Sequence, residues 1–148
     1  MDFDDIIGQH EMAQRLMRLA DEDRLPHAMM LCGPDGAGKM ALAIALATHI
    51  LNKGTFKVRG GKHPDLHFSF PTVKLKKWNA EYKPVSDDFI EQWYAMLADG
   101  PYFSLAQWME AMKAENQQAI ITVGEANELI KRLTMKSNQG GWKISIIW

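Results

Sequence analysis

Cysteine is scarce in this sequence, and neither sign of charge dominates it. Cys32 is the only cysteine among 148 residues, so the chain alone can build neither an internal disulfide nor a cysteine-based zinc site. We therefore expect no zinc, and a reducing, cytoplasmic setting. Lys and Arg number 17 against 18 Asp and Glu, a formal net charge of -1. No overall field would hold the protein on nucleic acid or on an anionic membrane, so any polyanion contact must be local.

Long hydrophobic runs are also missing. The longest one, Met40 to Leu51, contains Thr48 and His49 and is far shorter than the roughly 20 residues that span a bilayer. The N-terminus is acidic from Asp2 to Asp5, where a secretory signal would be basic and then apolar. We expect no membrane partner and no export by that route.

The remaining composition, 47% apolar and 24% charged, is that of an ordinary globular chain. Its first half predicts a strand, a glycine-rich loop and a helix in succession, after an amphipathic helix from Gln9 to about Arg24. The predicted elements are a short buried strand at Ala28–Cys32, a helix at Met40–Leu51, a connecting loop at Asn52–Lys62 and an edge strand at Leu66–Phe70. In that strand His67 and Ser69 alternate with the apolar residues, which predicts a less buried face.

The second half predicts a helical hairpin inserted at about residues 72–118, followed by one helix and one strand. Trp93, Leu97, Trp108, Met109 and Met112 should pack the hairpin on itself or on the sheet. The later helix starts at Thr122, whose spacing to Glu125 is that of a capping box. Its expected apolar face consists of Ala126, Leu129, Ile130 and Leu133, and the final strand is Trp142–Trp148. Because the chain ends on a strand without a turn, we expect it to be the front part of a longer protein.

One motif carries chemistry, and it lies between the first predicted strand and the helix after it. Its seven residues are Gly33, Pro34, Asp35, Gly36, Ala37, Gly38 and Lys39. The spacing matches the phosphate-binding loop, in which backbone N–H groups, a helix dipole and a lysine converge on a phosphate. A glycine-rich strand-to-helix turn without a ligand is the alternative explanation.

Two positions of a complete phosphate-loop site are filled by residues that cannot bind Mg²⁺. Met40 stands where the motif has the Ser or Thr whose hydroxyl binds the ion, and a thioether cannot replace that hard oxygen ligand. Trp148 follows the late apolar strand, where a second ligand, an Asp, is expected. We therefore predict no Mg²⁺, no catalytic residues, and a loop that has lost hydrolysis while still able to hold phosphate.

Three other candidate sites are weaker. His63 and His67 would be roughly 13 Å apart on extended chain, too far for one metal ion, and we expect them on the surface. Cys32 lacks the arginine six residues later that a cysteine phosphatase needs, so we expect a buried, inert thiol. The stretch Lys74–Trp78 could contact a nucleic-acid backbone, but a solvated loop is the simpler interpretation.

Several segments together resemble one family, the bacterial DNA polymerase III clamp-loader subunits of the gamma/tau and especially the delta-prime type. The residues that carry the resemblance are Phe3 to Gln9, Arg24-Leu25-Pro26-His27-Ala28, Gly33 to Lys39, His63-Pro64-Asp65-Leu66-His67, Ile121 to Leu133 and Lys143 to Ile147. The resemblance leaves out residues 52–62 and 72–118.

The resemblance implies an α/β fold, the AAA+ P-loop three-layer sandwich with a parallel sheet, here incomplete at the C-terminus. Residues 1–148 would then be the N-terminal part of the nucleotide-binding domain, with lid and collar domains absent. The family places the segment that includes Ile7 near the adenine and the residues from Gly33 to Met40 around the phosphates. It implies weak ATP or ADP binding, other clamp-loader subunits as partners in a hetero-oligomeric ring, and indirect contact with DNA.

Met40 and Trp148 resemble the delta-prime subunits, which are the non-hydrolysing members of that ring. We therefore predict a non-hydrolysing clamp-loader subunit of DNA replication. Two alternatives remain open: an active P-loop ATPase or phosphoryl-transfer enzyme, and a P-loop scaffold that binds a partner protein but no nucleotide. Mg²⁺-dependent hydrolysis would identify the first alternative, and absence of nucleotide binding would identify the second.

Overall fold

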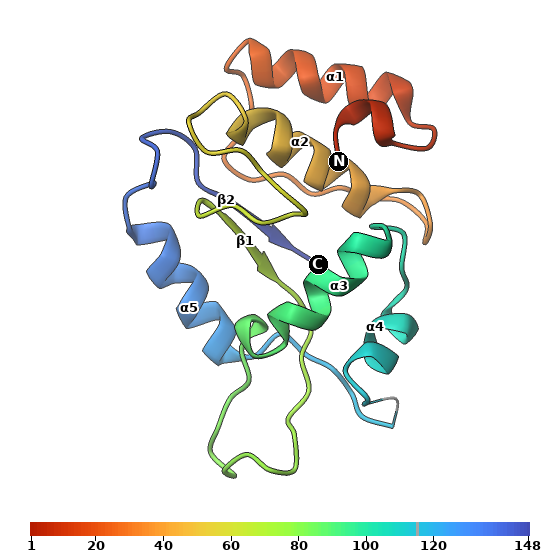
Figure 1. Cartoon of the computed structure of the whole chain (residues 1–148), viewed down its shortest axis with the longest axis vertical. Coiled ribbons are helices and arrows are strands. Elements are labelled where there is room, and N and C mark those ends of the chain that lie inside the picture. The colour runs from red at the N-terminus through yellow and green to blue at the C-terminus, as the bar shows by residue number, and fades with distance from the viewer. Residues whose placement is uncertain (115) are drawn as a thin grey trace.

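A computed structural model of the chain describes residues 1–114 and 116–148. Two short strands lie at its centre, surrounded by helices (Figure 1). The elements in chain order are η1 (Phe3–Asp5), α1 (His10–Asp21), α2 (Lys39–Leu51), β1 (Leu66–Ser69), η2 (Ser86–Phe89), α3 (Ile90–Asp99), α4 (Leu105–Ala111), α5 (Val123–Thr134) and β2 (Ile144–Ile147).

The sheet that the structure describes is parallel, with β1 beside β2 and Leu66 in register with Ile144. Side chains of β1 alternate between two faces, because successive residues of a strand point in opposite directions. Leu66 and Phe68 belong to a core cluster with residues of α2, α3 and α4, whereas His67 and Ser69 bond to Glu125 on α5. Helices therefore cover both faces of a small parallel sheet, as the predicted α/β class requires.

Strand β1 is buried along its whole length, on its polar face as well as on its apolar one. The prediction that His67 and Ser69 mark a less buried face is therefore wrong. The alternation of polar and apolar residues is real, but the polar face is covered by a helix that supplies a hydrogen-bond partner.

Helix α2 is apolar nearly all round because it lies between two layers. Met40, Ile44, Ala47 and Leu51 recur at helical spacing and pack in the core beside the sheet. The prediction of a helix buried against the sheet is confirmed.

The opposite side of α2 packs against α1 and η1 in a second core cluster. The α2 residues in this cluster are Ala41, Leu42, Ala45 and Leu46. Small side chains at two of these four positions let neighbouring elements pack closely on α2.

The inserted segment forms a helical hairpin, α3 and α4, which packs on the sheet. Trp93 and Trp108 are completely buried, Met109 and Met112 are buried, and Leu97 packs against the same cluster. The hairpin prediction is confirmed, and these side chains build core and not a partner-binding surface. Trp148, which follows β2, joins them through Trp93, with the ring centroids 5.5 Å apart.

Helix α5 begins after the predicted cap, because the Thr122 hydroxyl accepts a hydrogen bond from the Glu125 N–H at 3.2 Å. The reciprocal bond of a capping box is not formed, because the Glu125 carboxylate bonds to His67, Ser69 and Ser86 instead. The predicted apolar face is wrong. Ile130 and Leu133 are exposed and Glu125 is buried instead. The physical reason is that the polar residues of β1 face α5 and need a partner, so the helix turns its carboxylate toward them.

The predicted strand at Ala28–Cys32 is also wrong. This segment is not a strand, Met30 is 85% exposed, and Cys32 is an exposed thiol and not a buried one. A strand forms only by pairing with a neighbour, and within residues 1–114 and 116–148 this segment has no strand partner.

No helix in the described part of the chain is both long enough and apolar enough to cross a membrane.

Candidate functional site

The phosphate-loop residues form a turn that leads directly into α2. Gly36 and Gly38 have φ angles of 77° and 80°, a left-handed conformation that glycine adopts without strain. Gly38 is the N-cap of α2, and the first internal bond of the helix runs from the Leu42 N–H to the Gly38 carbonyl at 2.9 Å. The N–H groups before Leu42 therefore lie at the open end of the helix, where the helix dipole favours an anion.

Lys39 folds back over this turn. Its Nζ donates to the carbonyls of Gly33 at 2.8 Å and Pro34 at 2.7 Å. The ammonium is therefore beside the loop, as the motif predicts, but it is bonded to the protein itself. A phosphate group in the loop would compete with two carbonyls for this lysine.

The N-terminal turn, which includes Ile7 and Gln9, lies against the same loop. Gln9 donates from Nε2 to the Ala37 carbonyl at 3.3 Å, and the backbone N–H of Ile7 donates to the Tyr102 hydroxyl at 3.0 Å. The Ile7 side chain itself is 79% exposed. The structure thus places the segment from Ile7 to Gln9 beside the loop from Gly33 to Met40.

Met40 and Trp148 both belong to the packed interior. Met40 is buried in the main core cluster, and Trp148 packs against that same cluster. Among the residues that the structure describes, no group of three or more His, Cys, Asp or Glu side chains is placed to hold a metal ion. The two positions expected to bind Mg²⁺ therefore carry side chains that serve packing.

A buried polar cluster, which the sequence did not predict, lies between α5 and β1. Glu125 is 1% exposed and accepts hydrogen bonds from His67 Nε2 at 3.0 Å, the Ser69 hydroxyl at 2.5 Å and the Ser86 N–H at 2.6 Å. We call these four residues the Glu125 cluster. It joins α5, β1 and the insertion, because Ser86 lies in η2 just before α3.

The charge of Glu125 is stabilised despite its burial. Burial raises the pKa of this carboxyl, but the hydrogen bonds from His67, Ser69 and Ser86, together with the charge of His67, lower the pKa to about 2. A carboxylate that accepts several hydrogen bonds stays ionised at neutral pH. Glu125 is therefore a carboxylate whose oxygens are already bonded to donors of the protein.

The two histidines are buried, which corrects the prediction that they lie on the surface. His67 belongs to the Glu125 cluster, and His63 Nδ1 accepts a bond from the Asp65 N–H at 2.9 Å. The stretch Lys74–Trp78 is a loop, and its Trp78 ring packs edge-on against Tyr82 and Phe89. Because the Trp78 ring already makes these intramolecular contacts, it is poorly placed to stack on a nucleic-acid base.

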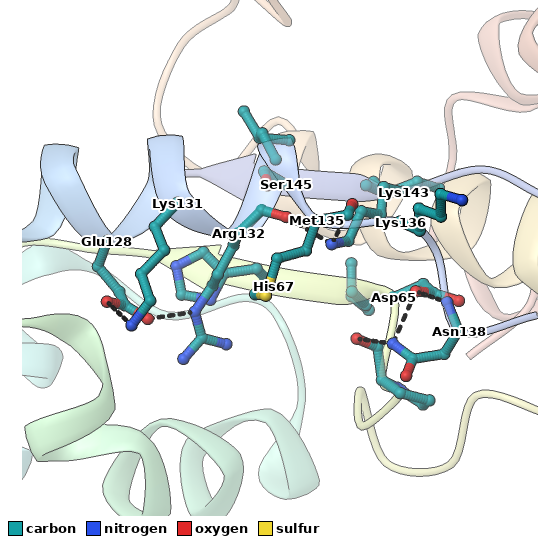
Figure 2. A pocket seen from close by; sticks show the side chains of 14 residues that line it. Asp65, His67, Glu128, Lys131, Arg132, Met135, Lys136, Asn138, Lys143 and Ser145 are labelled. Atoms are coloured by element: carbon teal, nitrogen blue, oxygen red, sulfur yellow. Dashed lines mark hydrogen bonds and ion pairs between the residues drawn. The ribbon is translucent and has the colours of Figure 1, made fainter.

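A cavity of about 420 Å³ lies between α5, β1 and the loop before β2. Figure 2 shows that several of its polar side chains bond to one another or to backbone carbonyls. Asn138 Nδ2 donates to Asp65 at 3.0 Å, and Arg132 Nε donates to Glu128 at 3.1 Å. Lys143 donates to the backbone carbonyls of Arg132 and Met135. Because these side chains are already bonded within the protein, we assign the cavity a structural role and place the candidate site at the phosphate loop.

Sequence reasoning missed two features near these sites. The sequence around Glu125 indicates only a capping residue, although polar residues at alternate positions of β1 indicate that a polar partner must face them. Tyr102 was not singled out, and no local pattern could have indicated it, because its partner Ile7 is 95 positions away in the sequence.

Comparison with known proteins identifies the family of the chain. The sequence profile of the family described as "DNA polymerase III, delta subunit" matches residues 8–148. Replication factor C small subunits of Methanothermobacter thermautotrophicus and Archaeoglobus fulgidus are 44% and 40% identical over 50 residues, which is 34% of this chain and 15% of each relative. Replication factor C subunit 3 of Saccharomyces cerevisiae is 38% identical over 50 residues, 34% of this chain and 14% of that protein.

These matched stretches are a small part of the length of the relatives. No solved structure matches the chain significantly. The family profile, in contrast, spans nearly the whole chain, and it confirms the resemblance to polymerase III clamp-loader subunits. The chain therefore belongs to the DNA polymerase III delta subunit family.

Proposed function

We propose that this chain is part of a sliding-clamp loader subunit of DNA replication that holds ATP or ADP weakly and does not hydrolyse it. The family membership supports the clamp-loader assignment. The observation that carries the finer proposal is the burial of Met40 beside a loop that keeps its glycine turn and its lysine. In this proposal the described sheet is one part of an AAA+ P-loop sandwich, and the partners are other clamp-loader subunits.

Weak nucleotide binding follows from what the loop retains. The open N-terminal end of α2 and Lys39 both favour phosphate, and each hydrogen bond to an anion contributes roughly 1.5–3 kcal/mol. Binding loses part of this energy because Lys39 must leave the carbonyls of Gly33 and Pro34. We expect Mg²⁺ to contribute little, since a buried thioether cannot bind it.

Calorimetric titration tests this proposal. Replacing Mg²⁺ with EDTA should change the affinity for ADP or ATP by less than about threefold, which is under 1 kcal/mol. Lys39→Ala should reduce the affinity, whereas Lys53→Ala, just past the far end of α2, should not. Strong dependence on Mg²⁺ would mean that another residue supplies the ligand and would overturn our assignment of Met40.

Hydrolysis gives an independent prediction. Steady-state ATP hydrolysis by the chain should equal that of a protein-free control, because neither Met40 nor Trp148 can organise the metal that phosphoryl transfer needs. A measurable rate that Lys39→Ala abolishes would instead support an active ATPase.

A second candidate function is a scaffold that binds a partner protein and no nucleotide. The observation in its favour is that Lys39 is already bonded within the loop. Absence of binding to ADP and ATP in both buffers would support this alternative.

A further inference from the structure

The inserted hairpin reaches the phosphate loop through one side chain, Tyr102. Its hydroxyl accepts the Ile7 N–H at 3.0 Å. A Cβ added at Gly38 would lie 3.5 Å from Cε1 of the Tyr102 ring, so the ring lies beside this glycine. Tyr102 therefore bridges the N-terminal turn and the loop at the residue that caps α2.

Tyr102 is held in this position by its neighbours in the chain. The segment between α3 and α4 is short, with Pro101 buried before the tyrosine and Phe103 packed after it. The Phe103 ring lies 5.3 Å from both Trp93 and Trp148. Ser104 then caps α4, accepting a bond from the Gln107 N–H at 3.3 Å. An anchored loop presents a side chain with little loss of conformational entropy.

A nucleotide whose phosphates lie at Gly38 and Lys39 must place its ribose and base beside the loop. Tyr102 already lies beside Gly38, and its hydroxyl already accepts the Ile7 N–H, so this side of the loop and this backbone donor are both occupied. A ligand made only of phosphate needs neither of these places. The tyrosine thus separates ligands by whether a nucleoside is attached.

We propose that Tyr102 is a specificity-determining residue that disfavours nucleotides at the phosphate loop while leaving it open to inorganic polyphosphate. This inference rests on the proposed phosphate-binding function of the loop. It assigns the insertion a role at the nucleotide site beyond packing. The insertion lowers nucleotide affinity by occupying the side of the loop that the nucleoside needs.

The test compares two ligands, ADP and inorganic tripolyphosphate, by calorimetry on the whole chain. Tyr102→Ala should raise the affinity for ADP about tenfold, and Tyr102→Phe, which removes only the bond to Ile7, about threefold. The affinity for tripolyphosphate should change by less than about twofold in both variants. Tyr82→Phe is the matched control, since this tyrosine of the insertion bonds to Asp88 and should leave both affinities unchanged.

Several results would overturn the inference. A lower ADP affinity in Tyr102→Ala would make the tyrosine a nucleotide contact, and an equal gain for both ligands would mean that it only restricts the loop. Binding of tripolyphosphate without ADP binding in any variant would show that something else excludes the nucleoside.

Hydrogen exchange at the Ile7 amide tests the contact without any ligand. Tyr102→Phe should speed exchange there relative to the unmodified chain, because the amide loses its acceptor. If no variant binds either ligand, the proposed nucleotide site fails. In that case an unchanged exchange rate of the Ile7 amide in Tyr102→Phe would overturn the contact between Tyr102 and Ile7 as well. A faster rate would support that contact even though the nucleotide site had failed.

Discussion

Replacing Glu125 with alanine should lower the free energy of unfolding by about 3–5 kcal/mol, the usual cost of removing one partner from a buried charged group. The change leaves the donors of His67, Ser69 and Ser86 buried without their acceptor. Each of these groups has lost water and cannot regain it without opening the fold. Urea unfolding at neutral pH, followed by circular dichroism, measures the effect.

The matched control is Glu128→Ala on the same helix. Glu128 is partly exposed, and its ion pairs with Lys131 and Arg132 lie at the surface. Such pairs contribute about 1 kcal/mol or less. Equal destabilisation by the two substitutions would mean that burial of the Glu125 cluster adds nothing to the free energy of unfolding beyond what a surface ion pair contributes.

The same carboxylate predicts how stability depends on pH. Its pKa falls from 4.5 to about 2 on folding, so the folded state favours the charged form. The stabilisation is complete above pH 4.5 and is lost as the pH falls toward about 2, a change of about 3 kcal/mol. Other carboxylates titrate in this range, so the informative quantity is the difference between the chain and Glu125→Gln. That difference should shrink steadily below pH 4.5, and a constant difference would contradict the assignment.

The features predicted correctly from the sequence are those that local chemistry decides. The Thr122 cap lies three residues from the N–H that it binds, and the glycine turn before α2 is a continuous stretch ending at Lys39. Apolar side chains at helical spacing, Trp93 with Leu97 and Trp108 with Met112, indicate the two helices of the insertion. In each case the residues that determine the structure are neighbours in the chain.

The failures come from contacts between distant segments. Ala28–Cys32 has the composition of a buried strand, but pairing depends on a neighbour that the described sheet does not contain. On α5, apolar periodicity indicated the face with Ile130, yet the hydrogen-bonding groups of β1 decided which side turned inward. Hydrophobic periodicity considers apolar residues alone. It therefore cannot predict that a buried hydrogen-bond network, and not the apolar side chains, determines which face of a helix is buried.

The candidate site divides in the same way. The glycine turn could be predicted from the sequence. The position of Tyr102 beside it could not, because this side chain reaches Ile7 and Gly38 only after the insertion has folded on the sheet. The position of the tyrosine therefore depends on the aromatic cluster beneath it.

That cluster centres on Trp93, which is 0% exposed. Its ring stacks on Phe70 with centroids 4.2 Å apart and meets Trp108 edge-on at 5.3 Å. Trp93→Ala should lower the free energy of unfolding by about 3–5 kcal/mol through lost transfer energy and the cavity left behind. Because Trp93 also supports Phe103, we expect faster hydrogen exchange at residues 100–104 as well.

Two further variants make this prediction specific. Trp93→Phe should cost less than half as much, because it keeps a ring and removes an indole N–H that has no partner among the described residues. Trp142→Ala, at a tryptophan that is 38% exposed, should cost less than about 1 kcal/mol. Circular dichroism in urea measures all three without relying on tryptophan fluorescence. A loss in Trp93→Ala no larger than that in Trp142→Ala would mean that the cluster does not hold the insertion on the sheet, and Tyr102 would then lack the support that its role at the loop requires.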